Sequence, residues 1–477
     1  MKHNKIYINS IIIILIITLF SSCDDLLETE PNDTVSNDVA LSDYKGNLAI
    51  LIGGYNGFRN TNYYQRDFIV TADALADNIK QTINNTSRLD GIANNRPFNH
   101  FNFWSEAYKV IASSNFVISS VDNNVITDAS AKDINQLKAE ALFLRAFAHF
   151  DVLRSYARNP NHVVKEPLGI PIILQPYKTQ EAIDYPPRET ISKSYDQIIL
   201  DLNTAFSIIE KNNTSNTKDR ANHITIQALL SRVHLYAGNW RDCITASDYV
   251  TNNIDFSIET NNYTNIFSKK SETIFGLSYL SHENPGLNGS LEGLFHINED
   301  GIGYGDFVAR QNLYESIESG DIRKNLYISG TKVGESVNFI GKYLGYLGEF
   351  GLDNIPLIRL SEIILNRAEA KAENNDLSGA LIDLNTIRNR AGITNITATT
   401  KENIIEATLK ERRIELAFEG HRIFDLKRKG SDIPKGNTGL DCTSECSIPY
   451  TDFRVIANIP ISEIDVNNNV KQNPGYQ

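Results

Sequence analysis

The sequence has none of the short motifs that mark the common hydrolases and nucleotide-binding proteins. Its 477 residues contain no HExxH, no GxSxG and no P-loop, so nothing in it supports an enzyme of those classes. The segment GIGYGD comes nearest to a phosphate loop, but it lacks the GxGxxG spacing and the strand and helix that should flank it, and we interpret it as turns. A glycoside hydrolase stays open, because its two carboxylates can lie far apart in the sequence.

A basic surface and a long apolar run are also missing. The formal net charge is -12, which argues against nucleic acid or an anionic membrane surface as a partner. One strongly apolar run, from Ile11 to Phe20, is too short to span a bilayer, which needs about 20 residues. Tryptophan is scarce as well: Trp104 and Trp240 both lie in helical patterns where packing explains them, so a platform for sugars would have to be Tyr, Phe or His.

The N-terminus, MKHNKIYINSIIIILIITLFSSCDD, has the parts of an export signal. Lys2 and Lys5 give a positive start, the apolar run follows, and two serines lead to Cys23. A cysteine at this place resembles the lipobox of bacterial lipoproteins, which implies cleavage before Cys23 and lipids on the cysteine; the alternative is an ordinary secretory signal. We expect a signal peptide over residues 1–22 and a lipidated tether over residues 23–40, anchored stably because more than one acyl chain is attached.

The other three cysteines predict no metal site. Cys442 and Cys446, in GLDCTSECSIP, are close enough to close a small disulfide loop, which an oxidising exterior would permit. A zinc site would need two further ligands, and none is near in the sequence. Cys243 falls at a core position of a helical pattern, so we expect a buried free thiol there. We expect neither a metal nor a cofactor.

Apolar residues at spacings of three and four predict a mostly α chain. Two later segments, LYAGNWRDCITASDYV and KAENNDLSGALIDLNTI, align with Gly238 on Asn375 and Cys243 on Ala380. Small residues at the turn and facing the next helix resemble tetratricopeptide hairpins. We expect such hairpins near residues 134–157 with 191–209, 224–252 and 356–390. Between about 255 and 351 the spacing is lost and Gly, Asn, Tyr and Phe are frequent, which predicts an irregular, loop-rich insert.

The segment ERRIELAFEGHRIFDLKRKG is rich in charge, yet it is apolar on two faces when it is placed on a helix. Such a helix lies between neighbours rather than at a surface. Glu411, Glu415 and Glu419 would then form a column of like charges that needs cations from elsewhere. A metal site in a helical bundle would need Glu-x-x-His pairs, which His421 does not supply. We expect buried ion pairs with arginines of the preceding segments: Arg367, Arg388 and Arg390.

The last third of the chain closely resembles the SusD/RagB family of Bacteroidetes outer-membrane lipoproteins. The resemblance rests on IRLSEIILNRAEAKAENNDLSGALIDLNTIRNRAG, on ERRIELAFEGHRIFDLKRKG and on the terminal QNPGY. The segment AEALFLRAFAHFDVLRSYA and the lipobox are similar to the family too, and Asp24 with Asp25 resembles the acidic export signal of surface lipoproteins. Asn468 is a departure, since proline is common there. The resemblance implies a single SusD-like domain over residues 41–477, on a tetratricopeptide-like helical scaffold with a loop-rich ligand region.

What the resemblance implies for function is capture rather than catalysis. The protein would sit at the cell surface, lipid-anchored in the outer membrane, bind oligosaccharides and pass them to a SusC-like TonB-dependent transporter. RagB-like members bind peptides instead, and a surface glycoside hydrolase is the third and weakest reading. We expect no enzyme activity and no nucleic-acid partner.

The candidate ligand site lies between the first helix and the helix that begins near Phe103. Aromatic faces can stack on sugar rings, while Arg and Asn supply fixed donors for hydroxyls. Neighbouring residues of an extended chain point oppositely, so one of the two tyrosines should be exposed. The candidates are Tyr63, Tyr64, Arg66, Asn78 and Arg96.

Three phenylalanines of the same region are interpreted as core residues: Phe98, Phe101 and Phe103. The alternative place for the site is the Gly- and Tyr-rich middle of the chain, around Tyr304 and Phe307.

Overall fold

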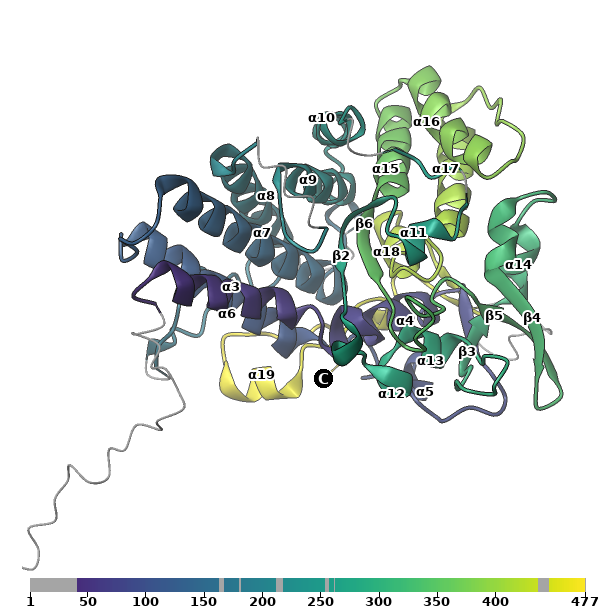
Figure 1. Ribbon diagram of the computed structural model, residues 1–477, viewed down its shortest axis with the longest axis horizontal. Helices are drawn as coiled ribbons and strands as arrows, with labels where there is room; N and C mark the ends of the chain where they lie inside the picture. The colour runs from purple at the N-terminus through teal and green to yellow at the C-terminus, as the bar shows by residue number, and fades with distance from the viewer. Residues whose placement is uncertain are drawn as a thin grey trace, which may run out of the picture.

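The computed structural model describes residues 41–162, 167–179, 182–211, 218–253, 257–260, 262–435 and 446–476. The expected signal peptide, Cys23, the tether and Cys442 lie outside this part of the chain. Helices dominate it and strands are few, which confirms the mostly α fold (Figure 1). No helix in the described ranges is long and apolar enough to cross a membrane.

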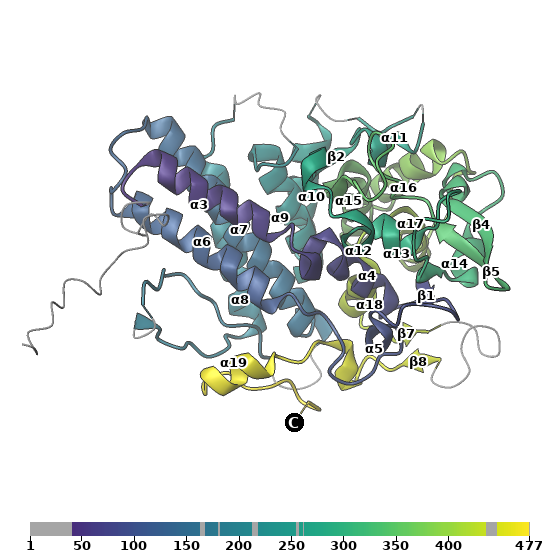
Figure 2. The same cartoon turned by 60° about the horizontal axis from the view of Figure 1, so that its bottom comes forward.

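The longer helices form an array that runs across the molecule from α3 to α17 (Figures 1 and 2). In this array α3 packs on α6 and α7, α7 on α8, α8 on α9, α9 on α10, α10 on α15, and α15 on both α16 and α17. Their bounds are α3 Tyr44–Gly57, α6 Trp104–Asp122, α7 Ala131–Tyr156, α8 Ile191–Ile208, α9 His223–Ala237, α10 Trp240–Thr251, α15 Leu360–Glu373, α16 Leu377–Arg390 and α17 Lys401–Glu415.

Helix α7 has 26 residues, and its second half is buried on all sides. Over AEALFLRAFAHF apolar residues fall on every side of the helix, which is the pattern of a helix without a solvent face. The helix begins where the Ser130 side chain accepts a hydrogen bond from the Asp133 backbone N–H, a standard N-cap. The charged residues inside it are paired; Arg145, for example, binds both oxygens of Asp201 on α8 at 2.8 Å.

The hairpins α9–α10 and α15–α16 share their turn geometry. Gly238 and Asn375, which align in the sequence, both take the left-handed conformation, with φ of 78° and 65°. Asn is one of the few non-Gly residues that tolerate this region. Cys243 and Ala380, aligned in the same way, are both fully buried, and Cys243 is a free thiol as expected. The tetratricopeptide-like division of the whole chain stays a prediction, but these two units have the same local design.

The segment between α10 and α15 is not structureless; it carries short helices and most of the strands. Strands β1 (Ile79–Gln81), β3 (Phe307–Ala309), β5 (Glu335–Ile340) and β4 (Tyr327–Lys332) form an antiparallel sheet in that order. Strand β2 (Thr273–Leu277) pairs with β6 (Ile355–Arg359), and β7 (Ile433–Pro434) pairs with β8 (Ser447–Ile448). The short helices of this segment are α11 Asn265–Ser268, α12 Gly286–Gly289, α13 Leu291–Phe295 and α14 Gln311–Ser316. Four further short helices lie elsewhere in the chain: α4 Asp67–Ala74, α5 Asp90–Ala93, α18 Arg422–Arg428 and α19 Ile461–Val466.

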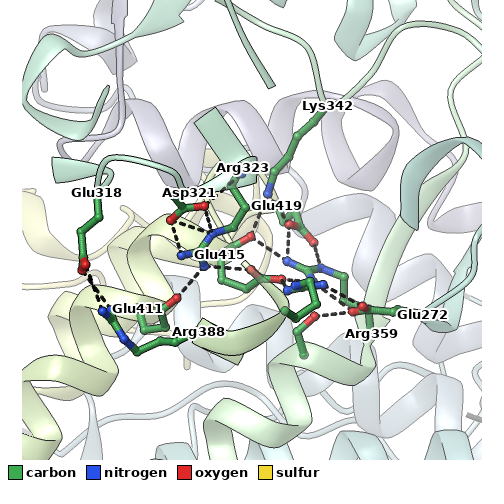
Figure 3. Close-up of polar contacts among 12 residues, drawn as sticks. Glu272, Glu318, Asp321, Arg323, Lys342, Arg359, Arg388, Glu411, Glu415 and Glu419 are labelled. Atoms are coloured by element: carbon green, nitrogen blue, oxygen red, sulfur yellow. Dashed lines mark hydrogen bonds and ion pairs between the residues drawn. The ribbon is translucent and has the colours of Figure 1, made fainter. Parts of the chain in front are cut away.

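A buried network of ion pairs joins this segment to the helical array (Figure 3). We call it the charged core. It consists of Glu272, Asp321, Arg323, Lys342, Arg359, Arg388, Arg390, Glu411, Glu415 and Glu419. Glu415 lies at its centre: its carboxylate is 2.6 Å from Arg359 and from Arg390, and 3.0 Å from Arg323. Burial alone would raise the pKa of Glu415, but these arginines hold that pKa well below its ordinary value.

The expected pairing of the glutamates is confirmed in part. Arg388 pairs with Glu411 and Arg390 with Glu415, as predicted. The prediction for Arg367 is wrong, because its guanidinium binds Asp248 and Asp383 instead.

The three glutamates do not lie on one helix, which corrects the expected column. Helix α17 ends at Glu415, and Glu419 reaches the network from the following turn. Phe418 and Gly420 both have positive φ in that turn, 67° and 82°, which a continuing α-helix cannot accommodate.

Candidate ligand-binding site

The two candidate tyrosines are both buried, so the prediction that one of them is exposed is wrong. Residues 61–65 form a single π-helical turn rather than an extended strand, and neighbouring side chains therefore need not point oppositely. The rings of Tyr63 and Tyr64 stack with centroids 4.9 Å apart. Their hydroxyls donate to the two oxygens of Asp151, at 2.7 and 3.1 Å. Neither ring offers a face to a ligand in this structure.

The polar candidates separate into one buried residue and two surface residues. Asn78 is buried, where its amide donates to Asp73 and its oxygen accepts from Arg413 at 3.0 Å, so it joins the end of α4 to α17. Arg96 is exposed and forms a 2.9 Å ion pair with Asp90. Arg66 is half-buried beside an aromatic and polar group that comes largely from the loop-rich middle of the chain.

We call this group the Tyr304 cluster: Arg66, Arg88, Asn288 and Tyr304. The Arg88 guanidinium lies 4.3 Å from the centroid of the Tyr304 ring and donates to the Asn288 side chain at 2.7 Å. The Tyr304 hydroxyl donates to the same Asn288 oxygen at 2.6 Å, and Arg66 donates to the Asn288 carbonyl. Asn288 is exposed and the other three are half-buried, so the cluster offers fixed donors and a ring edge at the surface.

Beside the cluster is a pocket of about 340 Å³, which we call the Phe98 pocket. Asp67 and Leu89, the sequence neighbours of Arg66 and Arg88, line it, so the pocket and the cluster are adjacent. Phe98 stands at its edge and is 52% exposed, which contradicts its interpretation as a core residue. The other lining residues are Thr71, Ile92, Asn99, His100, Phe101, Asn102, Asn458 and Pro460.

The loop that carries Phe98 has an unusual backbone. Ser87, Leu89, Asn95 and Phe98 all have φ between 48° and 65°, a region that is costly for large side chains such as Leu and Phe. Such outliers persist where the surrounding structure enforces them, and they are typical of ligand sites. The phenyl ring of Phe98 points outward although its backbone is strained. Phe101 and Phe103 lie in the core, as predicted.

The neighbouring sheet holds the loop in place. The Asp306 carboxylate accepts from the Thr86 N–H at 3.1 Å, and Gln81 donates to the Arg88 carbonyl at 2.8 Å. Lys332 donates to the Tyr304 carbonyl at 2.6 Å. The Tyr304 cluster and the first part of the loop are therefore fixed to the sheet, and they do not have to be ordered when a ligand binds.

The site is chemically suited to a neutral, hydroxyl-rich ligand. It combines an exposed ring, half-buried aromatic surface, amide groups and arginine donors. His100 is buried at the pocket, and burial lowers its pKa to about 3, so the imidazole is neutral at pH 7. In the described residues Asp67 is the one carboxylate that lines the pocket, and Arg66 donates to it at 2.6 Å.

The fold defines a helical-array protein whose candidate binding site lies on loops. Two family models match the chain: one described as "SusD family" over residues 344–476, the other as "Starch-binding associating with outer membrane" over residues 25–235. The chain belongs to the SusD/RagB family. A SusD-like protein of Formosa agariphila is 23% identical, with 96% of each chain covered.

Solved structures agree with this assignment. A SusD superfamily protein of Bacteroides thetaiotaomicron superposes with a TM-score of 0.80 at 26% identity, covering 91% of this chain and 100% of its own. A structure described as a laminarin-binding SusD-like protein gives a TM-score of 0.72 at 21% identity, covering 91% and 100%.

Proposed function

We propose that this protein is a surface lipoprotein that captures oligosaccharides at the Tyr304 cluster and the Phe98 pocket. The observation that carries the proposal is the exposed Phe98 ring on a strained, pinned loop beside the fixed donors of Arg88 and Asn288. The ring packs edge to face against Tyr476, with centroids 5.3 Å apart, yet it stays 52% exposed. A stacking role for sugar rings would explain why a strained backbone holds this ring at the surface.

Binding is better supported than hydrolysis. A glycosidase needs two carboxyl groups about 5 to 10 Å apart across the bond that it cuts. Asp67 is the one carboxylate lining the pocket in the described ranges, and it is already bonded to Arg66. The family description, which joins starch binding with the outer membrane, points the same way.

The remaining steps of the proposal rest on the sequence and on family membership. Lipids on Cys23 would anchor the protein in the outer membrane, and the tether over residues 23–40 would hold the domain at the cell surface. The captured oligosaccharide would pass to a SusC-like TonB-dependent transporter. A RagB-like preference for peptides is the alternative outcome of the binding experiment below.

Calorimetry with malto- and laminari-oligosaccharides and with short peptides tests the proposal. Phe98→Ala and Tyr304→Ala should each weaken binding of the preferred oligosaccharide about five- to thirtyfold, the effect of losing about 1–2 kcal/mol at an anchor residue. Tyr249→Ala is the matched control, because Tyr249 is a partly exposed ring on α10. Peptide binding with no response to sugars would favour the RagB-like alternative, and unchanged affinity in both site variants would move the site elsewhere.

A further inference from the structure

A second pocket lies on another part of the loop-rich segment. It has a volume of about 270 Å³ and is lined by α11, by the chain after β5 and by the residues just before β6. We call it the Asn354 pocket. Figures 1 and 2 both show α11 well separated from α5, which carries part of the Phe98 pocket. No described residue lines both pockets.

The two charged groups of the Asn354 pocket are already hydrogen-bonded within the protein. Lys342 is buried and donates to Glu419 at 2.6 Å and to the Glu415 carbonyl at 2.9 Å. The Asp353 carboxylate accepts from the backbone N–H groups of Gly345 at 3.3 Å and Glu292 at 3.1 Å. An anionic ligand would find no free cation here, because Lys342 is already paired, and burying the anion would carry a desolvation cost without compensation. The pocket therefore disfavours anionic ligands, whereas a neutral ligand is compatible with both charged groups.

One strong donor in the pocket is unused. The Nδ2 atom of Asn354 is buried and has no hydrogen-bond partner in the described part of the chain. This donor is already unsatisfied within the described residues, so an apolar molecule would gain nothing from it, whereas a ligand with an acceptor oxygen would satisfy it. The favoured occupant therefore offers an acceptor oxygen to Asn354 while it covers the apolar and aromatic wall formed by Phe267, Leu326 and Tyr346.

The pocket is also formed before any ligand arrives. The Tyr346 N–H donates to the Leu352 carbonyl at 2.6 Å, and the Gly351 N–H donates to Glu292 at 2.6 Å, so the loop that makes one wall is closed on itself and tied to α13. Its volume is slightly below the range of about 300–1,000 Å³ that holds drug-sized ligands, which leaves room for one small ring rather than a chain.

We propose that the Asn354 pocket binds a single neutral sugar ring, with a ring or hydroxyl oxygen accepting from Asn354 and an apolar face against Tyr346 and Leu326. This is a second carbohydrate subsite, separate from the Tyr304 cluster. It would engage a terminal or branching unit of a glycan, or a free monosaccharide.

Saturation-transfer NMR on the full mature protein tests this, with methyl glucoside, methyl galactoside and methyl mannoside as the three probes. At least one probe should receive saturation from the wild type, and Asn354→Ala should weaken its binding about two- to tenfold. Ser268→Trp, at the exposed end of α11, should abolish the signal by filling the mouth without touching the core. Ser207→Trp, on an exposed face of α8, is the control for an added tryptophan and should leave the signal intact.

The same probes separate this inference from the proposed oligosaccharide site. Tyr304→Ala should keep the monosaccharide signal, while Ser268→Trp should keep the affinity for oligosaccharides. If Tyr304→Ala abolished the monosaccharide signal and Ser268→Trp did not, single sugars would bind at the Tyr304 cluster and the Asn354 pocket would not be a sugar subsite. A wild type that transfers saturation to none of the three probes would overturn the inference as well.

Discussion

Replacing Glu415 by alanine should be one of the most damaging single changes to the scaffold. The charged core contains five carboxylates and five cations, so it is neutral as a unit. Glu415→Ala removes the contacts to Arg323, Arg359 and Arg390 and leaves one uncompensated positive charge in a dry interior. Breaking a buried ion pair from one side costs about 3–5 kcal/mol.

The structure places the expected loss near the lower end of that range. Each of the three arginines keeps another carboxylate: Glu419 for Arg359, Glu272 for Arg390, and Asp321 with Glu411 for Arg323. The expected loss in the free energy of unfolding is therefore about 3 kcal/mol. Glu415→Gln keeps the volume, so a similar loss in that variant would assign the effect to the missing charge and not to a cavity.

Urea unfolding followed by both fluorescence and circular dichroism measures the loss, provided that the two transitions coincide. Glu318→Ala is the control, because Glu318 is partly exposed at the edge of the network and its partner Arg388 keeps Glu411. This change should cost at most about 1 kcal/mol. A smaller loss for Glu415→Ala than for the control, or a lower ligand affinity at unchanged stability, would contradict the scaffold role of the charged core.

Three further predictions concern other parts of the chain. Burial raises the pKa of Glu292 to about 7, so the folded state favours the protonated form of this carboxyl group. The resulting stabilisation of the folded state is complete below the ordinary carboxyl pKa and is lost as the pH rises towards 7. With partial solvent screening, the contribution of Glu292 to the unfolding free energy should fall by about 1–2 kcal/mol between pH 4.5 and 7, and Glu292→Gln should reduce the fall. Thiol counting on the denatured, unreduced mature protein should find Cys243 alone reactive; three reactive thiols would refute the pairing of Cys442 with Cys446. Cys23→Ala should abolish lipid labelling and remove the protein from the membrane fraction, and continued membrane association would argue against the anchor.

The sequence predicted the charged core only where both partners lie on regular helices. Arg388 and Arg390 lie at the end of α16, the helix directly before α17. Buried carboxylates must be paired, and this requirement indicated these two arginines. Arg323, Lys342 and Arg359 come from the irregular segment or its boundary. The sequence of that segment has no helical or strand periodicity from which its path could be predicted. The partners that lie far away in the sequence were therefore missed, although the burial and pairing of the glutamates were predicted.

The residues of the candidate ligand site could not be placed one by one from the sequence. Tyr63 and Tyr64 were expected to alternate, and the π-helical turn that buries both has no sequence signature of its own. Phe98 looked like one of three similar core phenylalanines, because nothing in the sequence shows that its φ is positive. The sequence signal for the Tyr304 part of the candidate site is the density of Gly, Asn and Tyr around Tyr304. Such a composition is typical of loops, where binding residues concentrate.

The charged core also explains how a mostly helical protein can hold loops rigidly enough to bind a ligand. Lys342 belongs to both features: its ammonium group is tied to Glu419, and its side chain lines the Asn354 pocket. Arg323 and Arg359 likewise tie the loop-rich segment to Glu415 at the end of α17. Surface ion pairs are too weak to fix loops in this way, whereas buried ones cannot break without leaving a charge in a dry interior. These buried ion pairs therefore fix the loop-rich segment to the helical scaffold.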